Sequence, residues 1–157
     1  MELPTILIDT REQIPLFVDE QGVVRNEYKT LAYFVKATVK YGDYTLKGFE
    51  NIVSLERKTI SDLRNSLMTN HNRFVKVLTA MGQMVRSGIV VEGTEQDFTG
   101  LLGMPDYRKF YRTLVSIQVH YGVPIYWVYH HEGAERFVFS YLTTFLKYYR
   151  KGEMICK

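Results

Sequence analysis

Two carboxylates and a lysine are the side chains of this sequence best suited to chemistry. Asp43 follows Gly42, and Glu56 and Lys58 flank Arg57. Side chains alternate along a β-strand, so Glu56 and Lys58 are expected on one face and Arg57 on the other. Carboxylate oxygens with open positions for water and a phosphate suit Mg²⁺ or Mn²⁺. A neighbouring lysine can orient or deprotonate an attacking water, or offset charge on a phosphorane.

The spacing of two segments predicts that both carboxylates meet. Residues 34–46 alternate and are rich in Val, Thr and Tyr, and residues 52–56 have the pattern of a second strand. If Asp43 lies opposite Glu56, the turn must be centred within 47–51, which has turn composition. Register and turn therefore agree, and they place two carboxylates and one ammonium together. Two adjacent carboxylates repel each other unless a cation lies between them.

Each motif also has an ordinary structural explanation. Gly-Asp usually marks a turn, and Glu-x-Lys on a strand is usually a solvated pair. Only their joint occurrence, with a matching hairpin register, favours a site. Asp9, at the end of a short apolar segment, is a third candidate carboxylate, and Arg11 and Glu12 follow it in the next loop.

The remaining segments predict the elements that position this site. The polar stretch 10–28 predicts a loop, and Thr59 or Ser61 can cap a helix. Short apolar runs predict further strands at 5–9, 52–56, 88–93 and 125–129. Apolar residues at helical spacing predict helices over 74–81, 110–121 and 137–148. This order predicts an α/β domain with a central mixed β-sheet flanked by helices on both faces.

The composition is that of one ordinary globular domain. The chain has 157 residues, of which 46% are hydrophobic and 24% charged, so wholesale disorder is excluded and a single domain over 1–157 is expected. The sequence contains no long apolar run and no secretory signal pattern, so we expect an intracellular, cytoplasmic protein without membrane contact. The single cysteine, Cys156, allows neither an internal disulfide nor a multi-cysteine zinc site.

Basic side chains gather in two stretches, although the net charge is only +3. Such asymmetry suits a face turned toward phosphates, while a solvated basic face is the alternative. Tyr107 and Tyr111 interleave with the second stretch and could stack on unpaired bases, or belong to the rim of the core. The four histidines show no metal-ligand spacing and are expected to be non-catalytic, and His71, close in sequence to the active face, is the one alternative candidate. The candidate DNA contacts are Arg64, Asn72, Arg73, Lys76, Arg108, Lys109 and Arg112.

The predicted C-terminal helix is apolar on more than one side. Phe137, Tyr141, Phe145 and Tyr148 mark one stripe, and Phe139 lies outside it. One face must pack on the sheet, and the surplus predicts a homodimer interface through this helix. A strongly buried helix within a monomer is the alternative.

These motifs resemble the XPF-type nuclease domain of the XPF/Mus structure-specific endonucleases and of the archaeal Hef nuclease. The resemblance covers about the first half of the chain, and the later order of strands and helices looks similar. It implies a restriction-endonuclease-like core. The family pattern G-D-x(n)-E-R-K-x-x-x-D matches Gly42, Asp43, Glu56, Arg57, Lys58 and Asp62, and its D-x-R-E element matches Asp9, Arg11 and Glu12.

The resemblance implies a role for each matched residue. Asp43 and Glu56 would bind the divalent metal, with the backbone carbonyl of Arg57 and with Asp9 as further candidate ligands. Lys58 would act on the nucleophilic water. The residues that would hold the site together or touch phosphate are Arg11, Arg57 and Asp62, with Glu12 in support.

The resemblance also implies a function. Family members cut DNA near junctions of double and single strand, leave 5′-phosphate ends and act as dimers. We therefore expect a Mg²⁺-dependent DNA endonuclease for flaps or forks in DNA repair or recombination, with Mn²⁺ as a substitute. The chain ends at Lys157, without room for the family's tandem helix-hairpin-helix module, so we expect a stand-alone domain, of the kind a phage or mobile element encodes, or an excised fragment. The alternatives are a non-catalytic DNA-binding subunit with this fold, or a nuclease for Holliday junctions or RNA.

Overall fold

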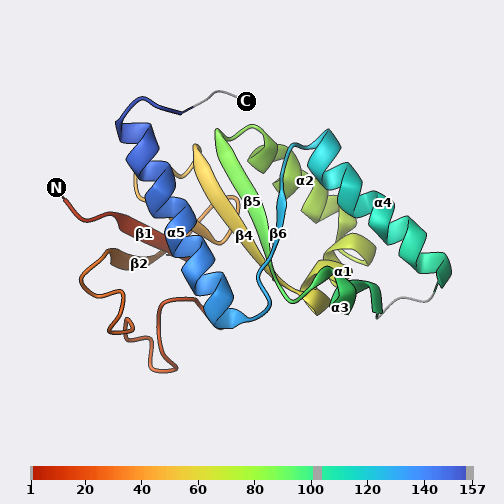
Figure 1. Cartoon of the computed structure of the whole chain (residues 1–157), viewed down its shortest axis with the longest axis horizontal. Coiled ribbons are helices and arrows are strands. Elements are labelled where there is room, and N and C mark those ends of the chain that lie inside the picture. Colours follow the sequence, from red (N-terminus) through yellow and green to blue (C-terminus); the bar gives the residue numbers. More distant parts are fainter. Residues whose placement is uncertain (1, 101–103, 155–157) are drawn as a thin grey trace.

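A central mixed β-sheet with helices on both faces organises the chain (Figure 1). The computed structural model describes residues 2–100 and 104–154. Within these ranges the sheet has six strands in the order β2-β1-β3-β4-β5-β6. The strands are β1 (Thr5–Asp9), β2 (Tyr33–Ala37), β3 (Tyr44–Leu46), β4 (Val53–Thr59), β5 (Arg86–Glu92) and β6 (Ile125–Trp127). The helices are α1 (Ile60–Met68), α2 (His71–Gly82), α3 (Glu95–Gly100), α4 (Met104–His120) and α5 (His131–Arg150).

Two hydrophobic cores lie on opposite faces of this sheet. Helix α5 and residues of the 10–32 loop cover one face, and α1 to α4 cover the other (Figure 1). The alternation of side chains along β5 feeds both cores, because Val90 joins the α5 side while Ile89 and Val91 join the other. The predicted α/β class, with helices on both faces, is confirmed.

The predicted register of the β3–β4 hairpin is also confirmed. The two strands are antiparallel, with Tyr44 opposite Leu55 and Thr45 opposite Ser54. One more step along both strands brings Asp43 opposite Glu56. The turn between them carries the bond from the Phe49 N–H to the Leu46 carbonyl, as its composition predicts.

The prediction of one continuous strand over residues 34–46 is wrong. This segment forms two strands on opposite sides of β1, with β2 parallel to β1 and β3 antiparallel to it. The chain between them passes the end of β1, where the Asp9 N–H donates to the Asp43 carbonyl. Gly42 has φ +86°, a left-handed conformation that interrupts any strand. The Val- and Thr-rich pattern marks extended chain but does not reveal this break.

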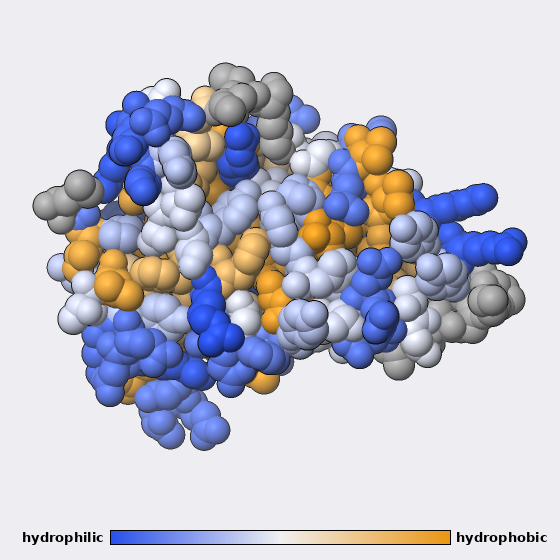
Figure 2. Space-filling view, in the orientation of Figure 1, coloured by the Kyte–Doolittle hydropathy of each residue, from blue (hydrophilic) through white to orange (hydrophobic). Residues whose placement is uncertain are grey.

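The helical stripes lie where their spacing predicts. Phe74, Leu78 and Met81 of α2 are buried, and so are Phe110 and Ile117 of α4. Helix α3 is an additional short element that the apolar spacing does not predict. On the outer side of α4, Val115 and Val119 are exposed, and Figure 2 shows hydrophobic residues gathered over this helix. None of the helices within the described residues has the length and apolar character needed to cross a membrane.

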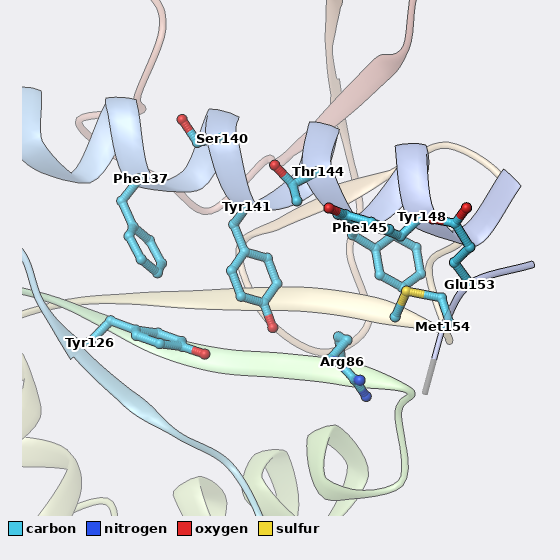
Figure 3. Close-up of a pocket in the computed structure, with 10 residues that line it drawn as sticks. All are labelled: Arg86, Tyr126, Phe137, Ser140, Tyr141, Thr144, Phe145, Tyr148, Glu153 and Met154. Carbon is cyan, nitrogen blue, oxygen red and sulfur yellow. The ribbon is translucent and has the colours of Figure 1, made fainter. Parts of the chain in front are cut away.

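Helix α5 uses most of its surplus apolar surface inside the chain. Phe139 packs on aromatic rings of the 10–32 loop, and Phe137 and Tyr141 pack on Tyr126 of β6. Figure 3 shows Phe137, Tyr141 and Tyr126 among the side chains that line a hollow of about 530 Å³ between α5 and the sheet. Tyr148, which also lines this cavity, remains 42% exposed. Little apolar surface of α5 is left over, so this helix supports a dimer interface less strongly than the sequence pattern alone suggests.

Candidate active site

A polar cleft of about 530 Å³ opens where β4 runs into α1. Its walls come from residues 40–43, the end of β4 and the helices α1 and α2. The family resemblance implies a catalytic or supporting role for seven residues that line this cleft. They are Arg11, Glu12, Asp43, Glu56, Arg57, Lys58 and Asp62.

Asp43 and Glu56 form the acidic centre of the cleft. Asp43 immediately precedes β3 and lies one register step beyond the Tyr44–Leu55 pair, opposite Glu56 of β4, and both line the same cleft. Burial raises the pKa of Asp43 well above its ordinary value, and the charges of Glu56 and Glu12 raise it further. The Arg57 N–H donates to Asp43 Oδ2 at 2.7 Å, which fixes the orientation of the carboxylate. The repulsion between two such carboxylates is relieved when one of them binds a proton or when a cation lies between them.

Gly42 explains how Asp43 reaches this position. A Cβ at residue 42 would overlap with Ser54 Oγ, and the φ of +86° is strained for other residues. Glycine therefore lets the chain turn tightly against β4 immediately before Asp43. Gly42-Asp43 therefore forms a turn, as such a dipeptide usually does, and this turn directs the Asp43 carboxylate into the cleft.

Lys58 is the cation closest to the acidic centre. Its Nζ donates to Glu56 Oε1 at 2.6 Å and lies 5.6 Å from the ring centroid of Phe74 on α2. Burial disfavours its charge, but the carboxylates of Glu56, Asp43 and Asp62 outweigh burial and raise the pKa of Lys58. Lys58 is therefore an ammonium group at neutral pH. Glu56 and Lys58 share one face of β4, as strand alternation predicts.

The Arg57 side chain extends away from Glu56 and Lys58 into an ion-pair network. Its Nη1 donates to Glu12 Oε2 at 2.9 Å, and its Nε donates to Glu92 Oε1 at 2.6 Å. Burial works against this charge, yet the bond to Glu92 and the charge of Glu12 raise the pKa of Arg57. The Arg57 guanidinium is thus already occupied by the carboxylates of Glu12 and Glu92.

Asp9 is the one candidate metal ligand that the structure does not bring into the cleft. It is fully buried, and its Oδ1 accepts from the N–H and Nε of Arg11 while its Oδ2 accepts from Arg11 Nη2 and the Val39 N–H. Burial opposes the charge, but these donors outweigh it and lower the pKa of Asp9. Four donors saturate a carboxylate. In this structure Asp9 anchors Arg11, and a role for Asp9 as a metal ligand stays a prediction.

Asp62 lies at the cleft edge in the first turn of α1. The Thr59 hydroxyl caps this helix by accepting from the Asp62 N–H at 3.2 Å, and it donates to Asp62 Oδ2 at 2.7 Å. This capping arrangement joins the end of β4 directly to α1. It therefore places the Asp62 charge near Lys58, whose pKa it helps to raise.

The candidate DNA-contacting residues separate into two groups. Arg73 and Lys76 of α2 line the cleft. The other five do not line it, namely Arg64, Asn72, Arg108, Lys109 and Arg112. On α4, Tyr107 and Tyr111 stack on each other with ring centroids 5.8 Å apart. The α4 group is therefore a separate surface.

Several cleft residues are not evident from the sequence pattern. Lys40 and Tyr41 precede the Gly-Asp turn, and the Lys40 ammonium lies 5.3 Å from the Tyr41 ring centroid. Asn65 and Asn70 line the helical wall. Adjacency to Gly42 is the signal that could have identified the first two. No sequence pattern identifies the two asparagines, because only the packing of the helices turns them toward the cleft.

The cleft suits a hard divalent cation held by few protein ligands. Among the described residues, no group of three or more His, Cys, Asp or Glu side chains is arranged to hold a metal. Mg²⁺ commonly uses only one or two carboxylates, keeps several waters and takes phosphate oxygens from the substrate. The raised pKa of Asp43 marks a deficit of positive charge at that point. Asp43 and Glu56 therefore fit such an ion.

Comparison with known proteins places this geometry in context. The family model described as the ERCC4 domain matches residues 8–140. The fold is similar to the solved structure of XPF from Aeropyrum pernix in complex with DNA, with a TM-score of 0.67 and 21% identity over 92% of this chain and 66% of that chain. A second structure of XPF from Aeropyrum pernix gives a TM-score of 0.66 and 19% identity over 90% of this chain and 61% of that chain. No curated protein matches the sequence significantly.

These similarities confirm the fold expected from the motifs. The six-stranded order within the described residues and the helices on both faces are those of the restriction-endonuclease-like core. Both archaeal chains are longer than this one, which spans less than two thirds of their length.

Proposed function

The chain belongs to the ERCC4 domain family, and from that premise we propose that it is a divalent-metal-dependent DNA endonuclease. One observation carries this proposal: Asp43, Glu56 and Lys58 converge in a single cleft at the end of a paired hairpin. A structural Glu56–Lys58 ion pair would need no second carboxylate, yet Asp43 lies in the same cleft with its pKa raised by burial and by the charges of Glu56 and Glu12. Two carboxylates that can hold a metal, beside an ammonium that can orient a water, are a sufficient set for metal-dependent phosphodiester hydrolysis.

The carboxylate pair supplies the metal-binding part of this mechanism. Asp43 and Glu56 would hold the cation together with the backbone carbonyl of Arg57. We propose Mg²⁺ as the cation, with Mn²⁺ as a substitute, because the ligands are oxygen atoms only. When bound, the ion would polarise the scissile phosphate and lower the pKa of a coordinated water.

Lys58 would orient the nucleophile and offset charge on the phosphate. Its raised pKa supports this role over that of general base, since a base needs a neutral amine at working pH. The bond from Nζ to Glu56 Oε1 keeps the ammonium directed at the acidic centre. The attacking water and the ammonium would then share the same side of the scissile phosphate as Glu56.

The cationic walls of the cleft would hold the DNA backbone. Arg73 and Lys76 on α2 and Lys40 opposite them would contact phosphates on either side of the cut. We propose branched DNA, such as a flap or fork, as the substrate, with 5′-phosphate products. The family membership supports this choice, and the solved relative in complex with DNA agrees with DNA as the ligand.

End-mapped cleavage tests the proposal. The wild-type chain is incubated with flap, fork, Holliday-junction and linear DNA and with a matched RNA, each with Mg²⁺, with Mn²⁺ or with EDTA. We expect metal-dependent cuts near the branch that leave 5′-phosphates, and no cuts by Asp43→Asn or Glu56→Ala. Binding of branched DNA without cleavage under either metal would identify a non-catalytic subunit. Preferential cutting of RNA or Holliday junctions would redirect the substrate assignment.

We also propose a homodimer through α5. Family membership supports it, and the aromatic cavity between α5 and β6 is the apolar surface available for it (Figure 3). Tyr148→Glu should convert a dimer to monomers in sedimentation velocity experiments, because it introduces a charge where an apolar contact is needed. Tyr33→Glu, on the opposite edge of the sheet, is the matched control and should remain dimeric. A wild-type monomer at high protein concentration contradicts the proposal.

A further inference from the structure

We propose that Glu92, the last residue of β5, positions the carboxylate pair of the cleft by holding Arg57 in place. Glu92 does not itself line the cleft. The inference rests on the proposed function, because it concerns the same site. It assigns a role to a residue outside the motifs, on a strand that contributes no side chain to the cleft within the described residues.

Arg57 contacts two different parts of the molecule. Its backbone N–H donates to Asp43 Oδ2 at 2.7 Å, whereas its guanidinium reaches Glu92 on the neighbouring strand. Regular β3–β4 pairing ends at Tyr44 and Leu55, so the bond to the Asp43 carboxylate takes the place of the next ladder bond. Any shift of the Arg57 backbone therefore moves the Asp43 oxygen with it.

Glu92 is the partner best placed to prevent that shift. Its Oε1 accepts from Arg57 Nε at 2.6 Å, and it is the largest favourable influence on the guanidinium charge, ahead of Glu12. Both side chains are nearly buried, with Arg57 10% and Glu92 13% exposed. Charge-assisted bonds in such surroundings are short and strong. The pair therefore fixes the arginine more firmly than a surface ion pair would.

The strand register explains how this pair acts on the cleft. Arg57 lies opposite Val90 and Thr59 lies opposite Glu92 in the parallel β4–β5 pair, so the Arg57–Glu92 contact is a diagonal across two strands. It spans the segment of β4 that carries Lys58. Beyond Leu55 the end of β4 has no β3 partner and pairs only with β5, and the Arg57–Glu92 bond adds a side-chain link to that one-sided pairing.

His131 completes the arrangement from α5. Its Nδ1 lies 3.1 Å from Glu92 Oε1 and 3.3 Å from Arg57 Nη2. The first residue of α5 thus contacts both members of the pair. Although its spacing indicated no catalytic role, His131 contributes to the support of Arg57. Outer residues that orient metal ligands typically contribute about 10–100-fold to metal affinity or activity.

The test compares Glu92→Ala with Glu92→Gln, which retains an acceptor for Arg57 Nε. Glu95→Ala removes an exposed carboxylate three residues further along the chain and is the matched control. For Glu92→Ala we expect kcat to fall by about 10–100-fold with KM for DNA unchanged, and Mn²⁺ affinity measured by calorimetry to fall about 10-fold. Glu92→Gln should retain most of the wild-type kcat and Mn²⁺ affinity, and Glu95→Ala should match the wild type in both measurements.

Amide hydrogen exchange gives a readout that needs neither cleavage nor metal. We expect the Arg57 N–H, read by NMR, to exchange at least about 10-fold faster in Glu92→Ala while the Leu55 N–H is unchanged. Faster exchange at every core amide would indicate general destabilisation and overturn the positioning role. Unchanged exchange at Arg57 would overturn it as well. If the wild type neither binds Mn²⁺ nor cuts DNA, the proposed function fails, while the exchange contrast still decides whether Glu92 holds Arg57.

Discussion

Asp43→Asn abolishes metal-dependent cleavage, with an expected loss of about 10³-fold or more, and raises the thermal stability of the metal-free protein. The loss of activity follows because an amide is a poor ligand for a hard divalent cation and one of the two candidate side-chain ligands is gone. The gain in stability follows because the introduced amide carries no charge beside Glu56. The amide oxygen still accepts from the Arg57 N–H, so the local geometry is retained.

The stability gain should depend on pH in a defined direction. The folded chain holds the pKa of Asp43 well above its ordinary value of 3.8, so the folded state binds more protons than the unfolded state between these two values. Stability that Asp43 contributes is fully present below about pH 4 and is lost as the pH rises through the folded pKa. Asp43→Asn has no such loss, so its advantage in Tm should grow from acid to neutral pH.

Thermal melting in EDTA and in Mg²⁺ measures both effects. A gain of about 1 kcal/mol corresponds to roughly 2–4 °C in Tm for a chain of this size. Mg²⁺ should raise the Tm of the wild type and leave that of Asp43→Asn unchanged, because only a folded state that binds the ion is stabilised. Glu95→Gln, an exposed acid outside the cleft, should behave as the wild type in every condition. An equal Mg²⁺-induced shift in Asp43→Asn contradicts the assignment.

The hairpin was predictable because its information is local. Turn composition within 47–51 and alternation on both sides specify a register, and that register is what brings Asp43 opposite Glu56. The same alternation predicts that Lys58 shares a face with Glu56 and that Arg57 does not. The start of helix α1 is likewise specified locally, since its cap Thr59 is the last residue of β4.

Other features depend on tertiary contacts that no local pattern contains. Asp9 has the right residue type at the right strand end, yet Arg11 folds back and occupies both of its oxygens. Nothing within the segment 34–46 reveals that β1 will lie between its two halves. Glu92 and His131 come from β5 and α5, and only the packing of α5 on the sheet brings them to Arg57.

Lys58→Ala should slow cleavage by about 10²–10³-fold while leaving metal binding intact. Lys58 Nζ donates to Glu56 Oε1 at 2.6 Å, so in the metal-free protein it neutralises part of the charge that a cation would otherwise balance. Its removal leaves the acidic pair more available to Mn²⁺, and affinity measured by calorimetry should stay the same or increase. The defect should therefore appear in kcat.

Lys76→Ala is the matched control, because Lys76 lines the same cleft from α2. If it contacts a DNA phosphate, its removal should raise KM and reduce the salt dependence of binding by about one phosphate contact, with kcat preserved. Lys58→Ala should instead lower kcat and leave KM unchanged. Equal effects of the two variants on KM would reduce Lys58 to a general phosphate contact.

The pH–rate profile separates the two chemical roles open to Lys58. Burial disfavours the Lys58 ammonium, but Glu56, Asp43 and Asp62 outweigh burial and raise its pKa, so the group stays charged throughout the neutral range. A general base would require the neutral amine, and activity would then rise steeply toward alkaline pH. An orienting ammonium predicts instead that the acid limb reflects ionisation of Asp43, whose pKa is raised by burial. It also predicts that Lys58→Arg, which keeps the charge, retains more activity than Lys58→Ala. An alkaline rise that disappears in Lys58→Arg would assign proton abstraction to the lysine.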